Sequence, residues 1–190
     1  MLPGVPRAAA GAPVTGAIEM GRGSYHAGDL AVRGYVDGEG VTIGRYCSIA
    51  PGVTFLAGGA HRTSLVSTWP FDPLLRGTSN ADSRTYKHQR RTVVGHDVWI
   101  STGAVLMAGI TIGNGAVIGP YAVVFDDVPS YTVLRGNPAY RARRRFDDEV
   151  CVALQAIAWW GWEPAVIASR VEDFYGPVAE FVEKYRNDAA

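Results

Sequence analysis

Histidines are the side chains in this 190-residue sequence best suited to proton transfer near neutral pH. There are four, His26, His61, His88 and His96. His61 stands in GAHRTSLVSTWPF (59–71), among hydroxyl and aromatic residues. A neutral imidazole there could act as a general base toward an alcohol. Most lone histidines are ordinary loop residues, so the case for His61 depends on what holds it.

The basic run RARRR (141–145) is a second group that could do chemistry. Arginine binds phosphate through charged, bidentate hydrogen bonds. The alternative is a solvated basic stretch, because Asp147, Asp148 and Glu149 follow it and resemble the acidic start of a helix. Both interpretations stay open for each arginine.

Four aromatic residues could line a pocket for a bulky, partly apolar alcohol: Tyr25, Tyr46, Trp69 and Phe71. The alternative is that they pack loops onto the core, which applies most strongly to Phe71. The tryptophans of WWGW (159–162) favour packing of a helix rather than a ligand site.

The elements that would position these residues follow a period of six. Steps of six from Val94 reach only aliphatic residues: Ile100, Leu106, Ile112, Ile118 and Val124. Four places after each stands a small or β-branched residue: Val98, Ala104, Ile110, Ala116, Ala122 and Val128. An earlier block repeats the pattern at Ile43, Ile49 and Phe55.

A period of six fits neither an α-helix nor a simple alternating strand. It is typical of a parallel β-helix, in which each flat face of a prism takes one hexapeptide. The aliphatic residue fills the prism and the small residue keeps the corner tight. A β-sandwich is the alternative, but its strands keep no strict period of six. The sequence therefore predicts an all-β core built as a parallel β-helix.

The two blocks of repeats are out of register, because Phe55 and Val94 are 39 residues apart. The chain must leave the prism between them. We therefore predict an excursion loop over about residues 61–92, and long structured loops are usually functional. His61 stands at its root, where the rigid prism would hold it.

The remaining segments complete the predicted organisation. Residues 1–17 are expected to form a flexible arm, residues 18–134 the β-helix with its excursion loop, and residues 135–190 a basic turn and a helical tail. In the tail, Val150, Leu154 and Ile157 have helical spacing, and a second helix is expected near 177–186.

Composition excludes several classes of protein. Lys+Arg and Asp+Glu both number 18, so there is no basic excess for nucleic acid. No apolar run is long enough to span a membrane. Cys47 and Cys151 are too few for a disulfide framework, and no secretory signal is evident, so we expect a cytoplasmic protein with reduced thiols.

The repeats, the histidine loop and the turn after the last repeat together resemble the hexapeptide-repeat acyltransferases. The closest resemblance is to their xenobiotic O-acetyltransferases, the streptogramin and chloramphenicol type. The similar segments are IGRYCSIAPGV (43–53), GAHRTSLVSTWPF (59–71), VVGHDVWIS (93–101), GNPAYRARRRF (136–146) and WWGW (159–162).

This resemblance implies a left-handed β-helix, a homotrimer, and acetyl-coenzyme A bound between subunits. It implies that His61 is the catalytic histidine. By the same analogy Thr102, Gly119, Pro138, Arg141 and Arg144 would contact the coenzyme. The chain departs from the family at His96, where asparagine is common, and at Thr102 and Tyr140, where a basic residue is common.

The predicted function is acetyl transfer from acetyl-coenzyme A to a hydroxyl of an antibiotic-like or other small molecule, with no metal, nucleic acid or membrane partner. His61 would deprotonate the alcohol, which attacks the thioester directly. A sugar or polysaccharide O-acetyltransferase is the nearest alternative. A γ-class carbonic anhydrase would need a further histidine at the position of Ser101, five residues after His96. A non-catalytic scaffold is also possible for this fold, but it would not require the His61 loop. His96 and Asp97 are expected to be surface and turn residues.

Overall fold

A computed structural model describes residues 14–15, 17–36, 38–87 and 89–187. Most of the predicted N-terminal arm lies outside these residues. Its end is not an arm, because residues 14–15 and 17–20 form strands β1 (Val14–Thr15) and β2 (Ala17–Met20). The strand β1 pairs antiparallel with β4 (Leu30–Gly34), so it extends the edge of a sheet.

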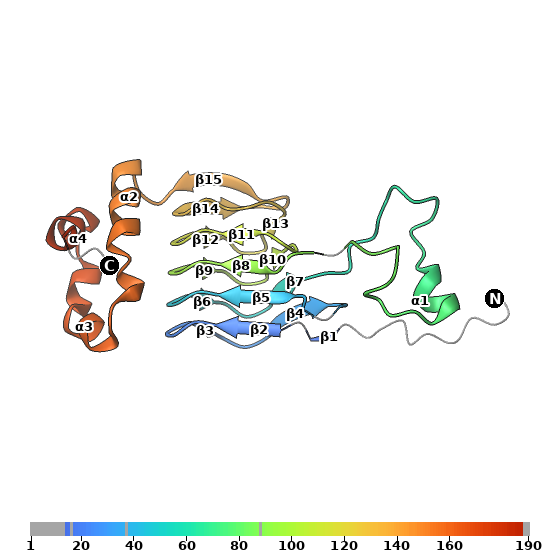
Figure 1. The fold of residues 1–190 in the computed structure, drawn as a ribbon. Coiled ribbons are helices and arrows are strands. Elements are labelled where there is room, and N and C mark those ends of the chain that lie inside the picture. The colour runs from blue at the N-terminus through green and yellow to red at the C-terminus, as the bar shows by residue number, and fades with distance from the viewer. Residues whose placement is uncertain (1–13, 16, 37, 88, 188–190) are drawn as a thin grey trace.

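The core is a parallel β-helix made of three sheets (Figure 1). Each coil contributes one short strand to each sheet, and strands in successive coils pair in parallel. The first two coils are formed by β2, β3 (Tyr25–His26) and β4, and then by β5 (Gly40–Ile43), β6 (Ser48–Ile49) and β7 (Val53–Leu56). Later coils contain β8 (Thr92–Val94), β9 (Trp99–Ile100), β10 (Val105–Leu106), β11 (Thr111–Ile112), β12 (Val117–Ile118), β13 (Val123–Val124) and β14 (Thr132–Arg135).

The prism is filled by the residues that repeat every six positions. The aliphatic residues from Val94 to Val124 in this register are each no more than 1% exposed. The small residues four places later are also buried. Burial of this stacked column supplies the hydrophobic stabilisation of the coils. The predicted inward and corner positions are therefore confirmed.

Glycines are required where a tyrosine from the next coil lies against a turn. Gly115 has a left-handed backbone, and a Cβ there would come within 3.0 Å of the Tyr131 ring. Gly103 has the same relation to Tyr121. An added methyl group would collide with each ring, so these turns need glycine for both space and conformation.

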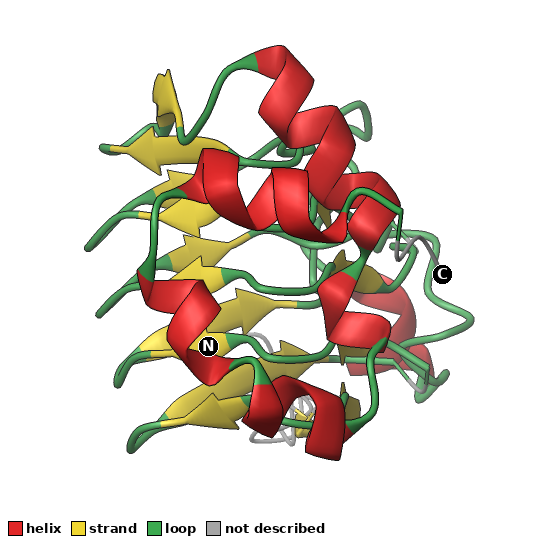
Figure 2. Ribbon diagram, turned by 90° about the vertical axis from the view of Figure 1, so that its left-hand side faces the viewer, coloured by secondary structure: helices red, strands yellow, loops and turns green. Residues whose placement is uncertain are grey.

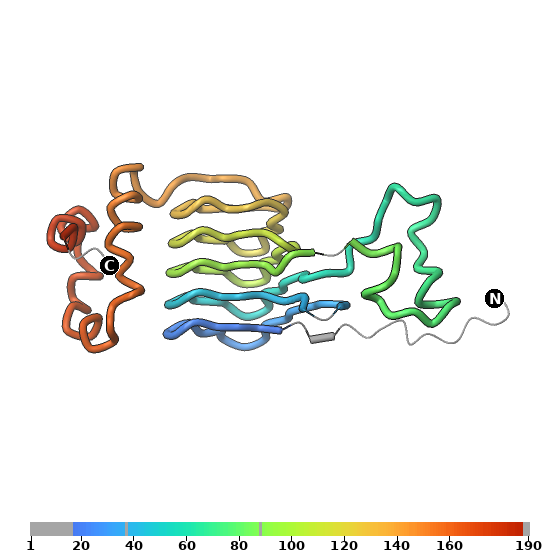
Figure 3. Tube along the Cα trace, viewed as in Figure 1, coloured from blue at the N-terminus to red at the C-terminus, as the bar shows by residue number. Residues whose placement is uncertain are grey.

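The excursion loop leaves the prism after β7 and returns at β8. It contains the short helix α1 (Phe71–Arg76) and projects away from the coils (Figure 3). Despite the insertion, β7 pairs directly with β10, and β5 with β8. The loop therefore interrupts the sequence of the repeats without interrupting their stacking.

The basic segment after the last repeat is a strand, which the sequence did not predict. Strand β15 (Tyr140–Arg144) runs antiparallel to β14 and covers the last edge of its sheet. The turn between them contains a cis peptide bond at Asn137–Pro138. A bulge between Val133 and Leu134 shifts the pairing along β15.

The C-terminal helices pack along one corner of the prism (Figure 2). They are α2 (Asp148–Ile157), the 3₁₀ helix η1 (Trp159–Gly161), α3 (Pro164–Ser169), the 3₁₀ helix η2 (Val171–Tyr175) and α4 (Val178–Tyr185). Asp147 caps α2 by accepting a hydrogen bond from the Val150 N–H. Hydrogen bonds connect the tail to the first coil, through Arg22 and the Trp162 carbonyl, and to the last, through Gln155 and Ser130. None of the helices in the described ranges combines the length and hydrophobicity that a membrane span requires.

Candidate active site

His61 is held at the root of the excursion loop with a defined tautomer. Its backbone forms an antiparallel bridge with Tyr86, and the Tyr86 ring contacts the imidazole edge-on at 4.9 Å. Its Nδ1 lies 2.6 Å from the carbonyl oxygen of Thr68. Because a carbonyl oxygen can only accept, Nδ1 must carry the proton. The Nε2 of the neutral ring is therefore an available base.

An ion-pair cluster fixes the part of the loop beyond His61. The buried carboxylate of Asp72 on α1 accepts two hydrogen bonds from the Arg84 guanidinium, at 2.8 and 3.0 Å. It also accepts one from the Arg84 backbone N–H at 3.2 Å and lies 3.4 Å from Arg76. These bonds from Arg84 lower the pKa of Asp72 to about 2. The cluster attaches α1 to the segment that returns to Tyr86.

Two predicted acceptor residues, Trp69 and Phe71, meet in this loop. Their rings are T-shaped with centroids 4.7 Å apart. With Leu65 and Val66 they line a largely apolar hollow of about 410 Å³, which we call the loop hollow. It adjoins Thr68, whose carbonyl orients His61. An apolar wall in the loop that holds His61 suits an alcohol with an apolar body.

The other two predicted acceptor residues lie elsewhere on this chain. Tyr25 is 57% exposed on β3, at the first coil. Tyr46 lies at the corner beneath the C-terminal helices, where its ring contacts Trp159 at 5.1 Å and fills the space above Gly23. The structure therefore places Trp69 and Phe71 in the same loop as His61, whereas Tyr25 and Tyr46 lie on the coils.

Three predicted coenzyme residues share one corner of the prism, which we call the turn corner. Thr102 and Gly119 stand in turns between the same two sheets in successive coils. Pro138 stands in the β14–β15 turn, which lies over the next strand at that corner because Gly136 and Ala139 form backbone hydrogen bonds with Val123. The Thr102 carbonyl accepts a hydrogen bond from Tyr121, and a Cβ at Gly119 would lie 2.9 Å from the Leu134 oxygen. The turns are therefore closely stacked at this corner.

The predicted arginines, Arg141 and Arg144, do not line the adjoining hollow. Arg141 is exposed on β15 opposite the inward-facing Leu134. Arg144 lies 3.2 Å from Asp148 and is engaged with the helical tail.

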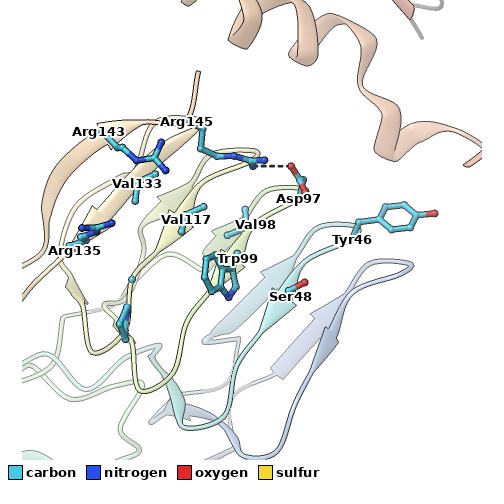
Figure 4. Close-up of a pocket in the computed structure, with 12 residues that line it drawn as sticks. Tyr46, Ser48, Asp97, Val98, Trp99, Val117, Val133, Arg135, Arg143 and Arg145 are labelled. Carbon is cyan, nitrogen blue, oxygen red and sulfur yellow. Dashed lines mark hydrogen bonds and ion pairs between the residues drawn. The ribbon is translucent and has the colours of Figure 1, made fainter. Parts of the chain in front are cut away.

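Other arginines line a hollow of about 430 Å³ on the outer face of the same sheet, which we call the arginine hollow (Figure 4). Arg135 and Arg143 flank it beside Gly119 and Pro120, and the Trp99 side chain forms part of its floor. Arg145 lies at the far side and pairs with Asp97 at 3.1 Å. Arg135 and Arg143 could not be predicted from the sequence, because the β14–β15 pairing with its bulge sets which arginines face the hollow.

His96 has the opposite hydrogen-bonding role to His61. Its Nδ1 accepts from the Arg45 backbone N–H at 2.8 Å, so its proton is on Nε2. Asn114 does the same one coil later, accepting through Oδ1 from the His96 N–H at 2.8 Å. Burial, with a contribution from Arg45, lowers the pKa of His96. His96 therefore accepts a backbone hydrogen bond at the corner of the prism, the role that an asparagine side chain fills one coil later.

The remaining histidines have no comparable setting. His26 is exposed, with Nδ1 2.9 Å from the carbonyl oxygen of Gly28, and His88 lies outside the described residues. Across the part of the chain that the structure describes, no three His, Cys, Asp or Glu side chains gather as a metal site would require. His26 shares the Nδ1 contact to a carbonyl oxygen, but among the described histidines only His61 stands at the root of the excursion loop, with the Tyr86 ring against it.

Comparison with known proteins shows the family to which this chain belongs. Residues 91–126 match the family model described as bacterial transferase hexapeptide, six repeats. A chloramphenicol acetyltransferase of Escherichia coli is 39% identical over 159 residues, which cover 76% of each chain. One of Agrobacterium fabrum is 44% identical over 126 residues, or 64% of this chain, and there the match spans only 60% of the relative's length.

A solved structure gives the same architecture. It is a hexapeptide-repeat acetyltransferase of Vibrio cholerae, complexed with acetyl-coenzyme A, with 27% identity and a TM-score of 0.52. The match covers 68% of this chain and 61% of that one. The fold and the repeat thus define a hexapeptide-repeat acyltransferase. Within that class, the chain belongs to the xenobiotic O-acetyltransferases, the group of the chloramphenicol acetyltransferases it matches.

Proposed function

We propose that this protein transfers an acetyl group from acetyl-coenzyme A to a hydroxyl of a small, partly apolar molecule such as an antibiotic. The observation that carries the proposal is the tautomer of His61, which leaves Nε2 free at the root of the loop that contains the apolar hollow. Membership of the family supports the acetyl donor, since a related structure holds acetyl-coenzyme A. The relatives named as chloramphenicol acetyltransferases support the acceptor class.

In this mechanism His61 moves one proton. Nε2 takes the proton of the acceptor hydroxyl as the oxygen attacks the acetyl carbonyl carbon. The tetrahedral intermediate then expels the coenzyme thiolate, and the imidazolium returns the proton to the sulfur. The products are an acetyl ester and free coenzyme A. The Thr68 carbonyl stabilises the imidazolium through Nδ1–H, because that bond strengthens as the ring becomes charged.

The turn corner and the arginine hollow are the proposed coenzyme surface. Backbone groups near Thr102 and Gly119 can pair with the amides of the pantetheine arm, and Pro138 can cover its far end. Arg135 and Arg143, beside Gly119, supply charge for the phosphates. These two arginines fit this role better than Arg141 and Arg144, since Arg144 is engaged with Asp148.

We also propose the handedness of the coils, the assembly of the subunits, the cellular location and the division into domains. We infer a left-handed β-helix over residues 18–134 and a homotrimer from the family. Within one chain, His61 and the turn corner belong to different corners of the prism. A trimer would let the loop of one subunit reach the turn corner of the next. We infer a cytoplasmic location because acetyl-coenzyme A is the donor.

The direct test is an acetylation assay with the purified chain. Acetyl-coenzyme A and chloramphenicol are supplied, thiol release is followed, and the product mass is measured. A β-galactoside serves as the comparison acceptor, since its body is polar. We expect acetylated chloramphenicol and little reaction with the galactoside. Coenzyme release without an acetylated acceptor, or a preference for the galactoside, would contradict the proposed acceptor class.

A further inference from the structure

Glu39 is a buried carboxylate that the proposed acetyl transfer does not use. It ends the turn between β4 and β5 and is 6% exposed. The other buried carboxylate in the described ranges, Asp72, is paired with Arg84. A buried carboxylate is costly unless its oxygens accept hydrogen bonds. The partners of Glu39 therefore show what it holds in place.

The Glu39 side chain closes the turn in which it stands. Its Oε2 accepts hydrogen bonds from two backbone N–H groups, that of Tyr35 at 2.7 Å and that of Val36 at 3.2 Å. The Glu39 N–H donates to the Val36 carbonyl at 3.2 Å. One residue thus fixes both ends of the turn.

The same turn is the surface from which the excursion loop leaves the prism, at Gly58 and Gly59. A Cβ added to Gly58 would overlap the Glu39 carboxylate. A Cβ added to Gly59 would overlap the Tyr35 ring, and the backbone there is left-handed, with φ +82°. The carboxylate and the ring therefore lie directly against the chain two and three residues before His61.

His61 itself stands in a short ladder of two chain segments. On one side of it, the Lys87 N–H donates to the Ala60 carbonyl at 2.7 Å. On the other side, the Arg62 N–H donates to the Thr85 carbonyl at 2.7 Å. Because these bonds join the ladder internally, its position relative to the prism depends on where the chain leaves the coils.

The loop also contacts this turn from its far side. The Asn80 side-chain amide donates to the Tyr35 carbonyl at 3.2 Å. The turn that Glu39 closes is therefore in contact with the loop both before and after His61. If the turn opened, the ladder that carries His61 would shift. A misplacement of about 1 Å can cost roughly 100-fold in rate.

We propose that Glu39 is a positioning residue for His61, an inference that rests on the proposed function of His61 as the base. Glu39 exchanges no proton with the substrate; it holds the turn that directs the chain toward His61. Both N–H groups bond to one oxygen, so the length of the side chain matters and its charge does not. Glutamine provides an oxygen at the same reach, whereas aspartate keeps the charge but is one methylene shorter.

The test compares Glu39→Gln with Glu39→Asp in the acetylation assay with acetyl-coenzyme A and chloramphenicol. We expect Glu39→Gln to keep a kcat close to that of the wild type. Glu39→Asp should lower kcat about tenfold or more, with the KM for acetyl-coenzyme A unchanged, because the reacting groups are misplaced. Wild-type kcat in folded Glu39→Asp, or a larger loss in Glu39→Gln than in Glu39→Asp, would overturn the inference.

Hydrogen exchange gives a readout that does not depend on acetyl transfer. In Glu39→Asp the amides of Tyr35, Arg62 and Lys87 should exchange about tenfold faster, while that of Ser101 in the coils should not change. Absence of turnover in the wild type would contradict the proposed function and leave this readout intact. Unchanged exchange at Arg62 and Lys87 would overturn the role given to Glu39.

A second variant covers the case in which Glu39→Asp does not fold. Gly58→Ala keeps Glu39 but places a methyl group where the carboxylate lies, so it should lower kcat as Glu39→Asp does. Gly161→Ala is the matched control, because no atom lies within 4 Å of its added Cβ, and it should keep the wild-type kcat. Equal kcat in Gly58→Ala and Gly161→Ala would overturn the inference.

Discussion

At the scale of single residues, hydrogen bonds give two histidines of the same chain opposite roles. The Nδ1 of His61 donates to Thr68, so Nε2 is a free base. The Nδ1 of His96 accepts from Arg45, so its Nε2 carries the proton. The sequence indicated His61 through its place at the break in the repeat. It could not show which nitrogen is protonated, because the Thr68 carbonyl belongs to the fold of the loop.

The His96 hydrogen bond predicts a pH-dependent stability that asparagine would remove. The folded protein holds His96 neutral and lowers its pKa, so the unfolded chain binds the proton more readily. The free energy of unfolding should therefore decrease as pH falls below the ordinary value of 6.5. His96→Asn keeps an acceptor for Arg45, as Asn114 does for His96, and should flatten this part of the profile.

Urea unfolding between pH 5 and pH 8 measures this effect, with the range set by the ordinary titration of histidine, roughly pH 6.5. His96→Ala is the control, since it leaves the Arg45 N–H without its acceptor and should be less stable throughout. An identical pH profile for wild type and His96→Asn would show that His96 does not control stability in this range.

Arg143 is predicted to bind a coenzyme phosphate and Arg141 is not. Arg143 lines the arginine hollow with Arg135, whereas Arg141 is paired opposite Leu134. Arg143→Ala should weaken coenzyme A binding by about 10- to 100-fold, as for a lost charged hydrogen bond. Calorimetric titration with coenzyme A, and with coenzyme A lacking the 3′-phosphate, measures the loss of affinity. Arg141→Ala is the control. Equal losses in both variants would contradict this choice.

At the scale of elements, the Asp72 cluster should control the excursion loop independently of the prism. Asp72 joins α1 to Arg84, and its low pKa keeps it ionised at ordinary pH. Asp72→Asn should make the loop more sensitive to protease and reduce turnover several-fold, while the core strands stay folded. Circular dichroism reports whether the core strands stay folded, and limited proteolysis reports the sensitivity of the loop.

The exposed Asp82, which accepts a hydrogen bond from the Ser79 hydroxyl, offers a matched control. Asp82→Asn should leave turnover and the rate of loop cleavage near those of the wild type. If the loop of Asp72→Asn resisted protease as well as the wild-type loop does, the Asp72 cluster would not be what orders the loop.

The coils could be predicted from the sequence because their inward-facing residues recur every six positions. Each inward residue from Val94 to Val124 returns after six positions, and each is buried. Strand β15 could not be predicted, since Tyr140–Arg144 has no apolar alternation and is held by pairing with β14. The same pairing, with its bulge, decides that Arg143 and not Arg144 lines the hollow.

At the scale of the whole molecule, we propose that two subunits share the active site. His61 and the turn corner lie at different corners of one prism, so a complete site would combine His61 of one subunit with Arg143 of another. Unfolding and refolding His61→Ala and Arg143→Ala chains together should restore activity above that of either variant alone. Each variant refolded separately is the control. Activity no higher than the sum of the separate variants would contradict a shared site.

The most direct test of the central claim is the turnover of His61→Gln with acetyl-coenzyme A and chloramphenicol. Glutamine keeps polarity and approximate size but cannot take a proton. We predict that kcat falls at least about 100-fold, as for loss of a general base, while calorimetry shows unchanged coenzyme binding. Turnover within a few-fold of wild type, with the coenzyme still bound, would contradict His61 as the base and with it the proposed mechanism.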